Sequence, residues 1–187
     1  MKKIILASKS PRRRQLLEWA EVDFEIMVED TDETFPPGLT PEEAAIHIAR
    51  EKSRAVRKKT GGDPIILAAD TIVVLGSQII GKPASREEAI ATLTALSGKK
   101  HQVITAVHIS TNDREITFAD QTDVRFHPLT ESQITYYVDH YQPYDKAGAY
   151  AIQEWIGVIG IHSIQGDFYN VMGLPVSRVV QSLQSFQ

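Results

Sequence analysis

An apolar segment, Pro64 to Leu75, which is interrupted only by Asp70-Thr71, limits the folds that this chain can adopt. Its two apolar runs are far too short to cross a bilayer, so the segment is predicted to be a buried strand. Helices with N-terminal caps are predicted on both sides of it, from Thr40 to about Lys59 and from Ser85 to Gly98. Strands that alternate with helices in this way predict an α/β protein.

The rest of the chain predicts a mixed sheet. Further strands are expected at 3–7, 22–28, 78–80, 101–110 and 114–126, and further helices at 10–21, 130–141 and 175–186. Residues 148–166 are expected to be loop and strand, and 166–175 a tight loop that delivers Asn170. No repeat or interdomain linker is visible, so residues 1–187 are predicted to form a single domain with two lobes that share one sheet.

Composition excludes several classes of function. The chain has no cysteine, which excludes a disulfide scaffold, a zinc site with cysteine ligands and a thiol nucleophile. The formal net charge of −4 argues against a surface that coats nucleic acid, so no nucleic-acid partner is expected. No convincing signal peptide follows Met1, and we expect a cytoplasmic protein without a membrane partner.

The segment around the predicted start of the first helix is unusually basic. Helix N-termini favour acidic groups, yet three arginines, Arg12 to Arg14, directly follow Ser10-Pro11. A bound polyanion would compensate, because its phosphates would meet free N–H groups, the Ser8 hydroxyl and the guanidinium groups. The alternative is a solvated turn whose arginines pair with acids such as Glu18 or Asp30. For the whole cluster we favour phosphate binding.

Asp70 is the second unusual residue, because a carboxylate inside an apolar strand is costly to bury without a partner. Its partner is expected to be a lysine, with Lys52 and Lys82 as candidates, or a divalent metal near a phosphate site. Glu33 lies on an acidic loop, and its default interpretation is a solvent-exposed side chain without a specific role. Gln153 carries both a donor and an acceptor, as a base-reading side chain needs, but a surface amide is its default interpretation.

Four blocks of residues together resemble the Maf family of nucleoside triphosphate pyrophosphatases, which is named for an association with septum formation. The blocks, which occur in the family's order, are residues 8–13, residues 69–71 with 81–83, residues 144–148 and residues 166–175. The resemblance implies a mixed α/β fold similar to that of inosine triphosphate pyrophosphatases. That fold has an elongated central sheet flanked by helices and two lobes around a cleft, and members are often homodimers.

The resemblance also implies roles for individual residues. Asp70 is implied as the catalytic acid or base, and Glu33 with Asp70 as ligands of a divalent metal cation, Mg²⁺ or alternatively Mn²⁺. The residues implied to bind the substrate phosphates are Ser8, Arg12, Arg13, Lys52 and Lys82. The residues implied to set substrate specificity are Arg12, Thr71 and Gln153.

The implied reaction is hydrolysis of dTTP and UTP, or of modified pyrimidine nucleotides, to the monophosphate and pyrophosphate. Water would attack the α-phosphorus with the assistance of a metal. Three alternatives stay open: a 7-methyl-GTP pyrophosphatase of the sister branch, a non-catalytic nucleotide-binding regulator of cell division, and an enzyme for non-canonical purine nucleotides.

Overall fold

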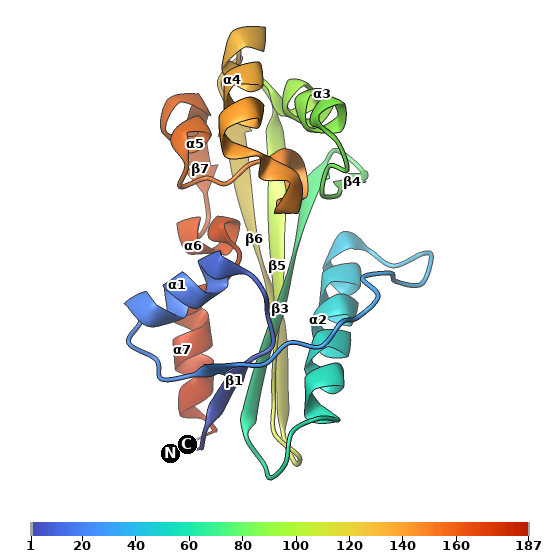
Figure 1. Ribbon diagram of the computed structural model, residues 1–187, viewed down its shortest axis with the longest axis vertical. Helices are drawn as coiled ribbons and strands as arrows, with labels where there is room; N and C mark the ends of the chain where they lie inside the picture. Colours follow the sequence, from blue (N-terminus) through green and yellow to red (C-terminus); the bar gives the residue numbers. More distant parts are fainter. Residues whose placement is uncertain (1, 187) are drawn as a thin grey trace. The chain divides into compact units, whose positions relative to one another are not determined.

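The computed structural model describes residues 2–186, and their strands form one seven-stranded mixed sheet with flanking helices (Figure 1). The strands are β1 (Ile4–Leu6), β2 (Glu25–Ile26), β3 (Ile65–Leu75), β4 (Gln78–Ile80), β5 (Lys100–Ser110), β6 (Glu115–Phe126) and β7 (Ile161–Gln165). Their order is β2-β1-β3-β5-β6-β7, with β4 paired to β3. Strand β1 is parallel to β2 and β3, whereas β4 and β7 are antiparallel to their partners. The predicted mixed α/β fold is confirmed.

The helices divide between two compact units. They are α1 (Pro11–Trp19), α2 (Pro41–Arg57), α3 (Arg86–Leu96), α4 (Glu131–Tyr141), α5 (Trp155–Gly160), α6 (Phe168–Met172) and α7 (Val176–Gln184), with the 3₁₀ helices η1 (Pro143–Asp145) and η2 (Ala147–Ala149). Unit 1 comprises the described residues up to Thr71, Thr105–Asp120 and those from Gly173 onward. Unit 2 comprises Ile72–Ile104 and Gln121–Met172. Strands β3, β5 and β6 therefore contribute residues to both units.

In unit 1, helix α2 covers one face of the sheet. It begins at the predicted capping box, in which Thr40 Oγ1 accepts from Glu43 N at 3.2 Å and Glu43 Oε2 accepts from Thr40 N at 2.8 Å. Val56, near the end of α2, packs with Ile66 and Ala68 of β3. Burial of these apolar side chains drives the helix onto the strands.

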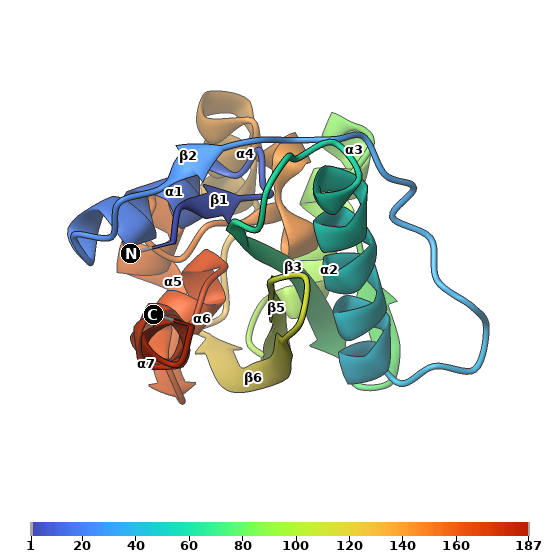
Figure 2. The same ribbon diagram turned by 90° about the horizontal axis from the view of Figure 1, so that it is seen from below.

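Helix α7 lies on the other face of the unit 1 sheet (Figure 2). Arg178 of α7 places its guanidinium carbon 4.1 Å from the centroid of the Phe118 ring on β6. Arg114 makes a similar contact at 5.1 Å with the ring of Phe186, just beyond α7. These cation–π contacts add to apolar packing and fix α7 against β6.

Unit 2 has its own apolar core, which contains Val73, Val103 and Val124 from three neighbouring strands. Helix α3 packs against α4 and η2, and α5 packs against α4 and β7. Only part of the predicted capping box at Ser85 forms. Ser85 Oγ accepts from Glu88 N, but Glu88 Oε2 accepts from Ala84 N at 2.7 Å.

Three predicted elements are wrong in extent. The strand expected over 22–28 is only Glu25–Ile26, and the segments expected to be loops contain α5 and α6. Helices of five or six residues are not stable alone and form only where packing supports them, so periodicity does not reveal them. Among residues 2–186, no helix is both long and apolar enough to span a membrane.

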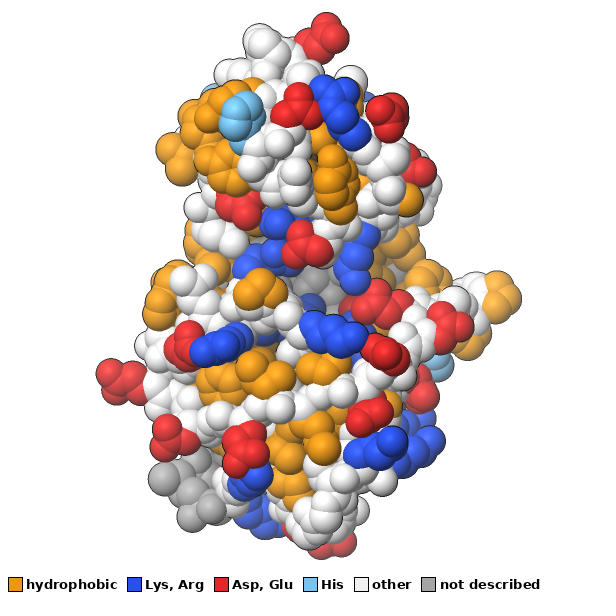
Figure 3. All heavy atoms as spheres, in the orientation of Figure 1, with side chains coloured by type: hydrophobic (Ala, Val, Ile, Leu, Met, Phe, Trp, Pro, Cys, Tyr) orange, Lys and Arg blue, Asp and Glu red, His pale blue; other side chains and the backbone are white. Residues whose placement is uncertain are grey.

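Charged side chains of both signs are interspersed over the face shown in Figure 3. Many cations are paired with acids, among them Lys3 with Glu25 and Arg86 with Asp139, both at 2.6 Å. Such exposed pairs contribute little to stability. Because each pair carries opposite charges, it also produces only a small electrostatic field around it.

Candidate active site

The turn between β1 and α1 carries the predicted phosphate-binding block. Ser10 is the N-cap of α1, and its side chain accepts from Arg13 N, as predicted. Ser8 is buried, and its Oγ accepts from Ser10 N at 3.2 Å. Of the surrounding basic side chains, Lys9 pairs with Asp30 at 2.6 Å and Arg14 with Glu18 at 2.7 Å. Part of the basic cluster therefore follows the alternative interpretation, in which nearby acids balance it.

Arg13 is buried and joins three of the four sequence blocks. Its Nε donates to Gly173 O at 2.8 Å, and its Nη1 donates to Ala69 O at 2.8 Å and Ser8 Oγ at 3.2 Å. Its Nη2 donates to Thr71 Oγ1 at 3.0 Å. A guanidinium group has five N–H donors, so most of them are used inside the protein.

Burial lowers the pKa of Arg13, and the negative charges of Asp70 and Glu33 oppose this shift. Arginine remains charged in proteins despite such shifts. The carbonyl and hydroxyl oxygens around the group compensate for its lost hydration. Arg13 thus holds the start of α1, strand β3 and the backbone at Gly173 in one arrangement within unit 1.

Lys52, on α2, joins two predicted acidic site residues. Its Nζ lies 2.7 Å from Asp70 Oδ1 and 2.8 Å from Glu33 Oε1. Lys52 is one turn before Val56 on α2, and Asp70 is two residues beyond Ala68 on β3, so each occupies the face that packs against the other element. Lys52, one of the two lysines predicted as partners of Asp70, therefore contacts it.

The cluster of Lys52, Asp70 and Glu33 can provide only some of the ligands that a divalent cation needs. Among residues 2–186, no group of three or more histidines and acids is arranged to hold a metal ion. Glu33 and Asp70 provide two carboxylates around a common cation, and Mg²⁺ commonly uses one or two carboxylates together with substrate phosphates. The donor set therefore fits a metal that arrives with a phosphorylated substrate.

Thr71 faces away from Asp70, because neighbouring residues on a strand point to opposite faces. Its Oγ1 accepts from Arg13 and lies 2.9 Å from Thr105 Oγ1 on β5. Thr105 is fully buried. Nothing in the sequence distinguishes it from other polar residues of strand 101–110, so only the structure identifies this contact.

The remaining predicted site residues, Lys82 and Gln153, lie in unit 2, and both are exposed. Lys82 lies just beyond β4, and its neighbour Gly81 accepts a hydrogen bond at its carbonyl oxygen from Gly148 N at 3.1 Å. Gly148 has φ +73°, a backbone conformation that favours glycine, and a Cβ there would lie only 3.0 Å from the Val73 side chain. The structure thus joins the block at 81–83 to the block at 144–148.

The prediction that Asn170 lies on a loop is wrong. It lies on α6 and is fully buried. Its Nδ2 donates to Val103 O at 3.1 Å and Thr122 Oγ1 at 3.0 Å, which links α6 to β5 and β6. Asn170 therefore has a structural role in unit 2.

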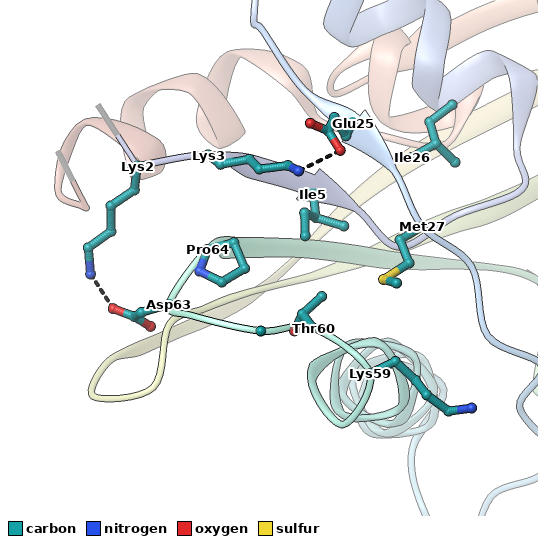
Figure 4. A pocket seen from close by; sticks show the side chains of 11 residues that line it. Lys2, Lys3, Ile5, Glu25, Ile26, Met27, Lys59, Thr60, Asp63 and Pro64 are labelled. Carbon is teal, nitrogen blue, oxygen red and sulfur yellow. Dashed lines mark hydrogen bonds and ion pairs between the residues drawn. The ribbon is translucent and has the colours of Figure 1, made fainter.

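A cavity of about 520 Å³ in unit 1 contains none of the predicted site residues (Figure 4). Its lining includes Lys2 and Lys3, which pair with Asp63 and Glu25. With its charges balanced in this way, the cavity is not a concentrated anion site.

The comparisons with known proteins agree with the sequence blocks. The family described as "Maf-like protein" matches residues 3–186. A protein of Parabacteroides distasonis named dTTP/UTP pyrophosphatase is 49% identical, over 98% of this chain and 96% of its own length. A protein of the same name from Bacillus cereus is 46% identical, over 100% of this chain and 96% of its own length.

The fold also resembles a solved structure. A HAM1 protein from Coxiella burnetii superposes with a TM-score of 0.52 over 99% of this chain and 100% of that chain, at 20% identity. At this level of identity the likeness concerns the fold alone. With a family match that spans nearly its whole length, the chain belongs to the Maf-like protein family.

Proposed function

We propose that the protein is a nucleoside triphosphate pyrophosphatase that converts dTTP and UTP to the monophosphate and pyrophosphate. The observation that carries this proposal is the likeness, over nearly the full length, to proteins named dTTP/UTP pyrophosphatase. The cluster of Lys52, Asp70 and Glu33 supports it, because it provides an acceptor for a proton and carboxylates for a cation.

We assign to Asp70 the role of the general base, which accepts a proton from the attacking water. The water oxygen forms a bond to the α-phosphorus, and the bond from that phosphorus to the bridging oxygen breaks. Pyrophosphate leaves with the bridging oxygen, and the water proton passes to an Asp70 carboxylate oxygen. A base placed in this way contributes about 10²–10⁴-fold to the rate.

The triphosphate carries a charge of about −4, so cationic and hydroxyl side chains are needed to bind it. We assign this role to Ser8, Arg12, Arg13, Lys52 and Lys82. Since most donors of Arg13 are used by protein acceptors, its contribution is mainly to orient Ser8 and the backbone of β3. Arg12, its half-exposed neighbour, is the better candidate for direct contact.

Glu33 and Asp70 would hold the divalent cation, with Mg²⁺ preferred and Mn²⁺ as an alternative. When bound, such a cation neutralises phosphate charge and so favours attack at phosphorus. Removal of divalent ions with EDTA is expected to abolish hydrolysis, and added Mg²⁺ or Mn²⁺ to restore it. Full activity in EDTA would contradict the assignment of these two carboxylates.

We assign nucleotide preference to Arg12, Thr71 and Gln153. The Gln153 amide is exposed, and it has the donor and acceptor needed for one edge of uracil or thymine. A site that depends on such hydrogen bonds rejects bases that leave them unmade. Gln153→Ala is therefore expected to weaken the preference among bases more than it slows the best substrate.

The experiment that tests the proposal is hydrolysis of a nucleotide panel with Mg²⁺, with products separated by chromatography. The panel contains dTTP, UTP, CTP, GTP, ITP and 7-methyl-GTP. Monophosphate and pyrophosphate from dTTP and UTP are expected. Activity only on 7-methyl-GTP or ITP would overturn the base preference, and binding without any product would favour a regulator of cell division.

A homodimer and a cytoplasmic location follow from the resemblance and the composition, and both stay predictions. Sedimentation of the purified protein tests the first, and cell fractionation tests the second. A role in septum formation is a separate prediction that needs a cell-division phenotype.

A further inference from the structure

Gln153 lies in a short turn of unit 2 that exposes its side chain on a buried support. Glu154 N donates to Ala151 O at 3.1 Å, which closes the turn. Ala151 and Ile152 are each only 4% exposed, whereas Gln153 is exposed. The position of the amide therefore depends on what holds the buried residues beside it.

The hydroxyl group of Tyr137 bridges the two ends of this turn. Tyr137 lies on α4 and is fully buried. Its hydroxyl oxygen accepts from Ala151 N at 3.1 Å, and its proton is donated to Glu154 Oε2. One phenol thus satisfies a buried backbone donor before Gln153 and a carboxylate after it.

Glu154 is also held by a cation. Its Oε1 lies 3.8 Å from Nζ of Lys146, a lysine that is 8% exposed and that also contacts Asp145 at 2.8 Å. Partly buried ion pairs are screened less by salt than exposed ones. The Glu154 carboxylate is therefore held by Tyr137 and by Lys146.

Helix α5 supports the turn from behind. A Cβ at Gly157 would lie 1.7 Å from Ile152 O, so the helix backbone approaches the turn more closely than any other residue would allow. Gly157 N also donates to Glu154 O at 2.9 Å. With these contacts, the turn has little freedom to move independently of α4 and α5.

We propose that Tyr137 is a positioning residue for base selection: its hydroxyl holds the turn 151–154 so that the Gln153 amide is presented in one orientation. This inference rests on the proposed function, in which Gln153 reads the base. A small displacement of a recognising group costs selectivity, because both of its hydrogen bonds depend on direction. Tyr137 itself does not touch the nucleotide.

The test compares Tyr137→Phe with the matched variant Tyr136→Phe, in which an exposed tyrosine of the same helix loses its hydroxyl. Phenylalanine keeps the ring but leaves Ala151 N without its acceptor. The ratio of kcat/KM for dTTP to that for ITP is expected to fall about tenfold in Tyr137→Phe. The kcat for dTTP is expected to stay within about threefold of wild type, and Tyr136→Phe to match wild type.

Amide hydrogen exchange provides a readout that does not depend on catalysis. Exchange at residues 151–154 is expected to be faster in Tyr137→Phe and unchanged in Tyr136→Phe. Glu154→Ala removes the acceptor of the Tyr137 proton, together with the contact to Lys146, and keeps the Tyr137 side chain in the core. It is expected to change selectivity and exchange in the same direction, and it serves if Tyr137→Phe fails to fold.

Two results overturn the inference. One is a wild-type ratio of kcat/KM for dTTP to that for ITP in both Tyr137→Phe and Glu154→Ala, and the other is an equal loss of activity on every nucleotide in these variants. If wild type hydrolyses no nucleotide, the proposed function fails instead. Exchange at 151–154 then decides by itself whether Tyr137 holds the turn, and unchanged exchange overturns the inference.

Discussion

The ammonium nitrogen of Lys52 lies 2.7 Å from Oδ1 of Asp70, although the two residues are 18 positions apart on a helix and a strand. The same nitrogen lies 2.8 Å from Oε1 of Glu33, so one cation balances two carboxylates. The side chains of Lys52 and Asp70 are 15% and 12% exposed, which weakens screening by water. Lys52 thus allows Asp70 to occupy an otherwise apolar strand.

Lys52→Met is expected to lower the free energy of unfolding by about 2–3 kcal/mol at neutral pH, because the buried Asp70 carboxylate loses its cation. Urea denaturation measures the change. Lys9→Met, which removes a fully exposed pair with Asp30, is the control and is expected to leave stability unchanged. Equal effects in the two variants would contradict a stabilising role for Lys52.

Asp70→Asn is expected to lower kcat for dTTP by at least about 100-fold, because an amide cannot take the water proton. The amide oxygen can still accept from Lys52, so the fold is expected to persist. Circular dichroism checks the fold, and product analysis checks turnover. A folded variant with near-normal turnover would show that Asp70 is not the base.

Arg13→Lys is expected to destabilise the protein by about 3 kcal/mol, because an ammonium group cannot reach the acceptors at Ser8, Ala69, Thr71 and Gly173 together. Denaturant unfolding measures the loss. Arg12→Lys is the control and is expected to change KM for nucleotide more than stability. The reverse pattern would mean that Arg13 serves mainly as a phosphate ligand.

Gly157→Ala is expected to destabilise the protein by about 2 kcal/mol or more, because the new Cβ would overlap Ile152 O at 1.7 Å. Gly61→Ala is the matched control, since nothing lies within 4 Å of a Cβ there. Thermal unfolding of both variants measures the difference. A stable Gly157→Ala protein would show that α5 and the turn can separate without cost.

Acid is expected to destabilise the protein through buried histidines. Burial lowers the pKa of His101 from 6.5 to about 4, and the nearby charge of Asp123 only partly opposes this. Between these values the unfolded chain binds a proton that the folded protein does not, so stability falls as pH falls from about 6.5 toward about 4.

The measurement is urea denaturation at about pH 7.5 and about pH 5, where His101 is expected to account for about 1–2 kcal/mol of the loss. His101→Gln keeps a polar partner for Tyr150 OH but does not titrate in this range. The free energy of unfolding of this variant is expected to fall less between the two pH values than that of wild type. His140→Gln, on an exposed position of α4, is the control and is expected to retain the wild-type loss.

Local sequence predicted the parts of the fold that depend on near neighbours. Thr40 and Thr130 cap helices through residues three positions away, and Ser10 does the same at the start of α1. The long strands β3, β5 and β6 follow from extended runs whose burial demands pairing. The sequence also indicated that Asp70 needs a cation, because the cost of burying a carboxylate does not depend on the fold.

The choice of partners could not be predicted in this way. Lys52 and Lys82 were equal candidates for Asp70, and packing of α2 on β3 brings Lys52 within 2.7 Å of it. The arginine cluster predicted a phosphate site, yet most donors of Arg13 bind protein oxygens that are up to 160 positions away. Such contacts depend on the path of the chain in space.

The mixed α/β class, the capped helices and the family membership could all be predicted from the order of residues along the chain. The three-dimensional arrangement of the chain was needed to show that Arg13 joins three of the four sequence blocks, that Asn170 is buried on a helix, and that Tyr137 is hydrogen-bonded to the turn of Gln153. The reason is physical. Caps and periodicity act within about four residues, whereas a buried polar group takes the partner that chain topology brings within hydrogen-bond distance.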